Sequence, residues 1–143
     1  MLAVGFVAQV AAIVLILSPL RALIFFVLQQ GLFGLYLGCA FAPNHKGMTM
    51  PPPGHRWGFL QRQVTTSRNV KGGRALTLAF GGLNYQIEHH LFPTMPMANL
   101  RRCQPIVRQH CLANGVDYCE TSLVRSYVAA LQHLRRAGSP VNG

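Results

Sequence analysis

The sequence has few acidic residues and few charges of any kind. Of its 143 residues only 3 are Asp or Glu and 13 are Lys or Arg, which gives a net charge of +10. Charged residues make up 11% of the chain, against about 25% in typical soluble domains. Arg21 is the only charged residue before Lys46, so an apolar first part precedes a basic second part. This division argues against an ordinary soluble domain and is typical of a membrane protein with a basic cytoplasmic tail.

The four cysteines form neither a disulfide framework nor a zinc motif. Cys39 lies in an apolar run, and Cys103, Cys111 and Cys119 follow without any Cys-x-x-Cys pair. Structural zinc sites and small disulfide-rich domains use other spacings. We therefore expect free thiols in a reducing compartment.

Two long apolar runs predict two membrane-spanning helices. Residues 1–20 carry no charge, and the run 22–43 is interrupted only by the uncharged pair Gln29-Gln30. About 20 apolar residues cross the hydrocarbon core of a bilayer. Pro19 and Arg21 separate the two runs. The predicted fold is therefore all-α: a membrane helical hairpin of two spans in residues 1–43, followed by a cytoplasmic helical cap in residues 44–143. Within the cap, helices are predicted over residues 75–91 and 100–114, the second weakened by Pro105, and a last helix is capped by Thr121 or Ser122 and ends at Gly138.

Two other interpretations of the first run are a signal peptide and a buried hairpin. A secretory signal peptide needs a basic start and a cleavage site with small residues, and no Lys or Arg precedes Arg21. A buried hairpin of a soluble protein would need a larger partner to cover it. The excess of Lys and Arg after the second run predicts an integral membrane protein whose C-terminal region is cytoplasmic.

Histidines supply the candidate chemistry. On a helix, Gln86, His89 and His90 fall at positions i, i+3 and i+4, so their side chains share one face. Imidazole nitrogens and an amide oxygen at that spacing can reach one metal ion. The alternative is a pair of surface histidines at a helix end. The other histidines after His45 are expected in a loop or on solvated helix faces: His55, His110 and His133.

The segment around these residues resembles a known motif. Residues 84–93, Asn-Tyr-Gln-Ile-Glu-His-His-Leu-Phe-Pro, closely resemble the third histidine box of membrane fatty acid desaturases. The variant with Gln in the first ligand position is similar to front-end and related acyl-lipid or acyl-CoA desaturases. Asn44-His45 resembles the Asn-His element that follows the last membrane span of that family. The likeness extends from Gln29 to Gly138.

This resemblance implies a metal site and a reaction. His45, His89 and His90 match iron ligands, Gln86 belongs to the same box, and Asn44 holds a metal-bound water or a hydrogen bond to a ligand. No catalytic residue beyond these is implied. The family uses a non-haem di-iron centre, molecular oxygen and electrons from a cytochrome b5 or a ferredoxin. Its substrate is a fatty acyl group on a lipid, on coenzyme A or on an acyl carrier. Glu88 is expected to orient a histidine or to meet a basic residue.

The sequence departs from that family in one respect. The two earlier boxes, of the HxxxH and HxxHH kinds, are absent from it, and no histidine precedes His45. Since the di-iron centre needs more protein ligands than the four residues named, we expect the C-terminal part of a desaturase, unable to form the centre alone.

Other functions stay open. A membrane fatty acyl hydroxylase would use the same residues, and an inactive fragment or partner subunit would use none of them. The basic residues are expected to contact lipid headgroups, an acyl-carrier phosphate or an acidic electron donor. No groove-reading motif supports nucleic-acid binding.

Overall fold

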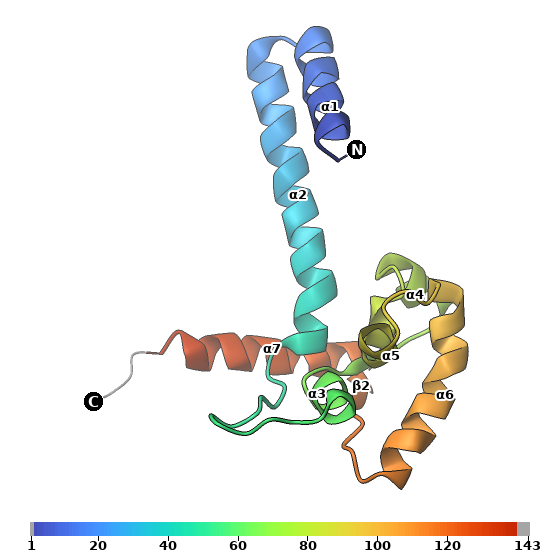
Figure 1. Ribbon diagram of the computed structural model, residues 1–143. Coiled ribbons are helices and arrows are strands. Elements are labelled where there is room, and N and C mark those ends of the chain that lie inside the picture. Colours follow the sequence, from blue (N-terminus) through green and yellow to red (C-terminus); the bar gives the residue numbers. More distant parts are fainter. Residues whose placement is uncertain (1, 140–143) are drawn as a thin grey trace. The chain divides into compact units, whose positions relative to one another are not determined.

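The computed structural model describes residues 2–139, and most of them are helical (Figure 1). The chain divides into two compact units, the first ending at Gly38 and the second beginning at Cys39. The elements follow in the order α1 (Leu2–Ile16), α2 (Pro19–His45), α3 (Phe59–Thr65), β1 (Asn69–Lys71), α4 (Arg74–Ala79), the 3-10 helix η1 (Leu83–Tyr85), α5 (Gln86–Leu91), α6 (Met97–Ala113), β2 (Glu120–Ser122) and α7 (Leu123–Ala137).

The first unit contains α1 and most of α2. The break between them falls just before Pro19, as the sequence predicts, because proline is tolerated in the first helical turn and not inside a helix. The ring of Phe6 meets that of Phe26 edge to face, with the centroids 6.3 Å apart. Most of the apolar side chains in this unit are exposed. Such exposure is expected of helices that face lipid rather than water.

One helix among residues 2–139 is long and apolar enough to cross a membrane. It is α2, which has 27 residues. Helix α1 has 15 residues. At about 1.5 Å per residue α1 is roughly 22 Å long, which is less than the bilayer core of about 30 Å. The second predicted span is therefore present as a helix of sufficient length, whereas the first span stays a prediction.

The second unit has a small core built around α5. Ile87 of α5, Val64 of α3 and Cys111 of α6 are fully buried together, and Val107 of α6 is buried beside them. Helix α5 has only six residues, and so short a helix is unstable in isolation. Its conformation therefore depends on these contacts with α3 and α6, and so does the position of the histidine box.

A short parallel sheet joins two distant parts of this unit. Strand β1 pairs with β2, with Asn69 opposite Glu120 and Lys71 opposite Ser122. The prediction of an all-α fold is wrong at this point. Each strand has three residues, which is too short a segment for a period of two to be recognised in the sequence.

Two glycines interrupt the helix predicted from residue 75 to residue 91. Gly81 and Gly82 separate α4 from η1 and α5, with φ of +58° and +85°. Glycine adopts this left-handed region without the steric cost of a Cβ. A Cβ at Gly82 would also lie 2.4 Å from Cγ of Met97, the first residue of α6. The break therefore lets α5 run separately from α4 while α6 passes close by.

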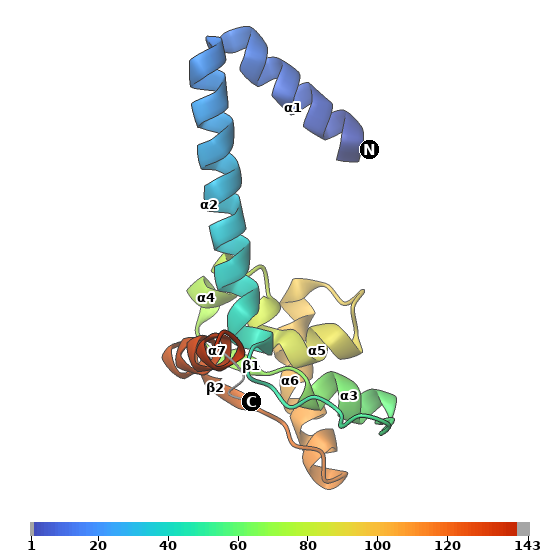
Figure 2. The same ribbon diagram turned by 90° about the vertical axis from the view of Figure 1, so that its left-hand side faces the viewer.

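Helix α7 begins and ends where the sequence predicts. The Ser122 hydroxyl accepts a hydrogen bond from the Arg125 N–H at 3.4 Å, and Gly138 follows the last helical residue. In both views α7 lies across the C-terminal end of α2 (Figures 1 and 2). There the Tyr127 hydroxyl donates to the carbonyl oxygen of Cys39 at 2.7 Å.

Candidate functional site

The last turn of α2 reaches the histidine box through Asn44. This side chain is fully buried. Its Nδ2 donates to the carbonyl oxygens of Ala40 and Leu83, each at 3.0 Å, and lies 3.4 Å from Oε1 of Gln86. Asn44 thus connects the end of α2 to the first residue of α5. These two segments are 42 residues apart in the chain.

Gln86 in turn forms a hydrogen bond with His90. The two residues are four apart on α5, and Nε2 of Gln86 lies 2.9 Å from Nε2 of His90. Because Oε1 of Gln86 already accepts from Asn44, its Nε2 group donates to the imidazole. Gln86 is 2% exposed, so water does not compete for these bonds. The shared helical face that the sequence predicts for Gln86 and His90 is confirmed.

Three imidazoles meet in a row beside this pair of amides. The rings of His45 and His90 stack with centroids 5.0 Å apart and an interplanar angle of 22°. The rings of His89 and His90 have centroids 6.3 Å apart. The structure therefore brings together all five residues that the sequence singles out, with His90 in contact with both other histidines: Asn44, His45, Gln86, His89 and His90.

The surroundings of His90 favour its neutral form. Burial lowers the pKa of His90, and the neighbouring imidazoles of His45 and His89 lower it further. Only a neutral imidazole binds a metal, through the lone pair of one ring nitrogen. In His90 this lone pair is on Nε2 and accepts from Gln86, so a metal bound there would replace that hydrogen bond.

Two buried atoms of the site lack partners among the described residues. They are Nδ1 of His90 and Oδ1 of Asn44. A buried polar atom without a partner costs about 1–3 kcal/mol, so such atoms are commonly satisfied by a water or an ion. Of these two atoms Oδ1 of Asn44 is an acceptor, whereas Nδ1 of His90 carries the ring proton while Nε2 accepts from Gln86. Imidazole and amide groups are ligand types that iron accepts, and iron on His90 would replace one of the bonds of the ring. The residue types at this site fit the edge of an iron site.

They do not fit a complete one. In residues 2–139 no three His, Cys, Asp or Glu side chains lie close enough together to hold a metal ion. That these residues contribute ligands to a metal centre therefore stays a prediction.

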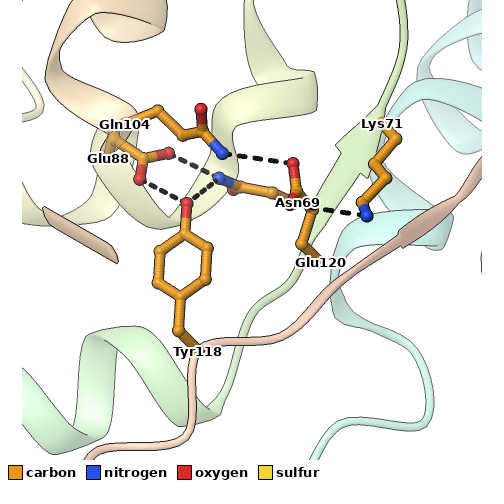
Figure 3. A network of polar contacts seen from close by, with 6 residues as sticks. All are labelled: Asn69, Lys71, Glu88, Gln104, Tyr118 and Glu120. Atoms are coloured by element: carbon orange, nitrogen blue, oxygen red, sulfur yellow. Dashed lines mark hydrogen bonds and ion pairs between the residues drawn. The ribbon is translucent and has the colours of Figure 1, made fainter. Parts of the chain in front are cut away.

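Behind the histidine face, α5 is anchored by a buried polar network whose partners the sequence does not specify (Figure 3). Glu88 is fully buried, and its Oε1 accepts from the Tyr118 hydroxyl at 2.7 Å. Its Oε2 accepts from Nδ2 of Asn69 at 2.6 Å, and the same Nδ2 lies 2.6 Å from the Tyr118 hydroxyl. Oδ1 of Asn69 accepts from the Ile87 N–H at 2.9 Å.

This network corrects the prediction made for Glu88. The hydrogen-bond partners of its carboxylate are Asn69 and Tyr118, and neither a histidine nor a basic residue is among them. Burial raises the pKa of Glu88, and the hydrogen bonds from Tyr118 and Asn69 oppose that shift. Burial and the nearby carboxylate raise the pKa of Tyr118, which therefore keeps its proton to donate.

The remaining histidines lie outside the site. His55 is exposed in the loop between α2 and α3, and His110 and His133 are exposed on α6 and α7. Nε2 of His110 lies 3.5 Å from Nδ2 of Asn114. Their predicted positions, a loop and solvated helix faces, are confirmed.

Comparison with known proteins adds independent information. A family model described as fatty acid desaturase matches residues 1–122. The chain is 37% identical over 119 residues to the Caenorhabditis elegans protein named Delta(6)-fatty-acid desaturase fat-3, which is 82% of this chain and 27% of that protein. It is 33% identical over 115 residues to the acyl-lipid (9-3)-desaturase of Physcomitrium patens, which is 80% of this chain and 22% of that protein.

A shorter stretch is more similar still. Over 56 residues, 39% of this chain and 12% of the relative, the chain is 54% identical to the Delta(5) fatty acid desaturase fat-4 of Caenorhabditis elegans. The chain thus spans about a quarter or less of the length of these relatives. No solved structure matches the chain.

Proposed function

The chain belongs to the fatty acid desaturase family, and on that premise we propose that it forms the C-terminal part of a membrane-bound, iron-dependent desaturase. The reaction introduces a double bond into a fatty acyl chain with molecular oxygen and electrons from a cytochrome b5 or ferredoxin type donor. The observation that carries this proposal is the approach of His45 to His90, with ring centroids 5.0 Å apart although the two residues belong to different helices.

The ligands that this chain would contribute are His45, His89, His90 and Gln86. Bound iron supplies the oxidising power needed to remove hydrogen from an unactivated methylene group. Oδ1 of Asn44 is a buried acceptor left without a partner at this place, which supports a ligand there, and iron on His90 would replace the hydrogen bond from Gln86. Since the described residues hold no group of three His, Cys, Asp or Glu side chains suited to a metal ion, the rest of the proposed centre would come from other histidines, on a longer form of this chain or on a second chain.

The chain's own residues position the ligands. Asn44 donates to Gln86, and Gln86 donates to His90, so the imidazole is held by the protein before any metal binds. Helix α2 places His45 at the end of a helix that is long enough to cross a membrane. An acyl chain within the membrane therefore comes close to the site, while electrons arrive from the cytoplasmic side.

Basic residues suit the cytoplasmic partners. The second unit holds 12 of the 13 Lys and Arg residues, since only Arg21 lies in the first unit. Of the described residues, a single cation forms an ion pair, Lys71 with Glu120 at 3.8 Å. Apart from Arg68, which is buried and donates to the carbonyl oxygen of Lys46, the other cations can attract anionic lipid headgroups, an acyl-carrier phosphate or an acidic electron donor.

A chimera tests the function directly. The segment of the Caenorhabditis elegans Delta(6) desaturase that matches this chain is replaced by the corresponding residues of this chain, and the fatty acids of yeast expressing the chimera are analysed by gas chromatography and mass spectrometry. We expect a new double bond that disappears with His90→Ala and is retained with His110→Ala, which alters an exposed histidine outside the site.

Other outcomes of the same experiment are informative. An alcohol in place of the double bond would support the hydroxylase. A chimera that is made at normal levels and inserted in the membrane, yet forms neither product, would contradict the proposal. It would favour an inactive fragment or a partner subunit.

A further inference from the structure

Helix α7 carries an apolar face that its own unit leaves uncovered. It is the most amphipathic of the four helices longer than ten residues. The unit buries Ser126 and Ala130, on a different side of the helix from most of the large apolar residues. The uncovered residues follow one another at spacings of four and three, and so form one stripe along the helix. This apolar stripe consists of Val124, Val128, Leu131 and Leu134, which are 72%, 47%, 65% and 49% exposed.

The place of α7 in the unit suggests what covers this stripe. The Tyr127 hydroxyl bonds to the carbonyl oxygen of Cys39 in α2. A Cβ on Gly47, just beyond α2, would lie 3.2 Å from the carbonyl oxygen of Ala129. Helix α7 is therefore held against the last turns of α2 and the residues that follow it. If α2 spans a membrane, these turns lie where the helix leaves the hydrocarbon, so α7 lies at the height of the membrane surface.

The charge on α7 also favours a position at the membrane surface. The helix contains Arg125, Arg135 and Arg136 and no acidic residue. None of these arginines belongs to an ion pair within the described part of the chain. Arg125 and Arg136 lie beside the apolar stripe, and Arg135 lies in line with it at the C-terminal end, where its long side chain can still reach headgroups. A helix with one apolar stripe, arginines and low overall hydrophobicity is the kind that lies in a membrane interface, and its binding is strengthened by anionic lipid.

We propose that α7 lies in the plane of the membrane surface, with the apolar stripe in the boundary between headgroups and acyl chains and its arginines on anionic headgroups. This arrangement fixes the height of the end of α2, which carries Asn44 and His45. The inference rests on the part of the proposed function that places α2 in the membrane, and the experiment below separates the two.

The depth of single tryptophans tests the arrangement. Trp57, the one tryptophan of the chain, is changed to Phe. Tryptophan is then introduced by Leu131→Trp on the stripe, by Gln132→Trp as a matched control at the next, also exposed position, and by Leu28→Trp in α2 as a reference for insertion. Each variant is reconstituted in phosphatidylcholine–phosphatidylglycerol vesicles that contain lipids brominated on their acyl chains.

Adjacent helical positions point about 100° apart, so an in-plane helix predicts opposite results at 131 and 132. We expect bromolipid to quench Leu131→Trp at least about twofold more than Gln132→Trp, with emission at shorter wavelength. Aqueous acrylamide should quench Gln132→Trp more. The contrast should weaken when phosphatidylglycerol is omitted or when Arg135 and Arg136 are both changed to Gln.

The results that would overturn the proposal are distinct. If Leu28→Trp is quenched by bromolipid while positions 131 and 132 are equally open to acrylamide, α7 lies in water and only the inference on α7 fails. If bromolipid and acrylamide both fail to reach position 131, a protein surface covers the stripe. A tenfold dilution of protein in lipid then shows whether that surface is a second copy. If bromolipid does not reach Leu28→Trp, the proposed membrane location of α2 fails as well.

Discussion

The anchoring of α5 by Glu88 leads to a quantitative prediction for Tyr118→Phe. The substitution removes one hydroxyl and leaves the ring. That hydroxyl donates to Oε1 of Glu88 at 2.7 Å and lies 2.6 Å from Nδ2 of Asn69. Glu88 keeps its second hydrogen bond, from Asn69 at 2.6 Å. The change therefore deletes one of two side-chain donors to a fully buried carboxylate.

The expected cost follows from the charge of the acceptor. A hydrogen bond to a charged group contributes about 1.5–3 kcal/mol, more than a neutral one. Tyr118 is only partly buried, so water can replace the hydroxyl to some extent, which favours the lower end of that range. Since about 1.4 kcal/mol corresponds to a tenfold change in an equilibrium constant, opening of α5 should become about tenfold more favourable.

Hydrogen–deuterium exchange of the chain in nanodiscs measures this opening. The most direct reporter is the Ile87 amide, which donates to Oδ1 of Asn69. We expect the peptide that contains α5 to exchange about tenfold faster in Tyr118→Phe. The matched control is Tyr127→Phe, which deletes another tyrosine hydroxyl bond, to Cys39, and should affect α7 and not α5. Unchanged exchange of α5 in Tyr118→Phe would falsify the anchoring role of the network.

Three further predictions concern the metal, a turn and a thiol. Titration of the purified chain with cobalt(II) should show at most one ion per chain, with affinity lowered at least about tenfold by His90→Ala and unchanged by His110→Ala; two tightly bound ions per chain would contradict the incomplete ligand set. Both Gly81→Ala and Gly82→Ala should destabilise the fold by about 1–2 kcal/mol through left-handed strain. Gly82→Ala should cost at least about 1 kcal/mol more, because only at Gly82 would a Cβ clash with a side chain, at 2.4 Å. Equal melting temperatures of the two variants would refute this. Burial raises the pKa of Cys111, whereas a free thiol has a pKa of about 8.5. Raising the pH from 7 to 9 should therefore accelerate alkylation of Cys111 by N-ethylmaleimide less in the folded protein than in urea. Parallel pH profiles in the two states would show that the thiol is not shielded.

Local features of the fold could be predicted from the sequence because neighbouring residues determine them. The break before Pro19, the N-terminal cap at Ser122 and the end of α7 at Gly138 each depend on a few adjacent residues. Pro105 predicts a weakened or interrupted helix, but α6 runs from Met97 through this proline. Buried residues on both sides of that proline hold the helix together: Leu100, Val107 and Cys111.

Features that depend on distant contacts could not be predicted in this way. The pairing of β1 with β2 and the Glu88 network join segments far apart in the chain. One signal for the network was available. Glu88 is one of three acidic residues in the chain and directly follows Ile87 in an otherwise uncharged segment, which indicates burial with donors, although not which donors.

In the candidate site, too, contacts within one helix could be predicted from the sequence and contacts between distant segments could not. Helical periodicity was enough to pair Gln86 with His90, and the structure bears this out with an atom–atom distance of 2.9 Å. Periodicity says nothing of His45, which lies on another helix. Only the resemblance to desaturases grouped His45 with the box, and the structure brings its ring against that of His90.

The two amides explain how a partial ligand set can still be well ordered. An amide can accept and donate at once, and Gln86 does both: its oxygen accepts from Asn44 and its nitrogen donates to His90. A second imidazole in the place of Gln86 has only one donor and one acceptor nitrogen on a rigid ring, and could not make both bonds with the reach of this side chain. The orientation of His90 is therefore set by hydrogen bonds within the chain. If the proposed metal centre forms, this order reduces the ordering that metal binding must otherwise bring about, although iron on Nε2 of His90 would replace the bond from Gln86.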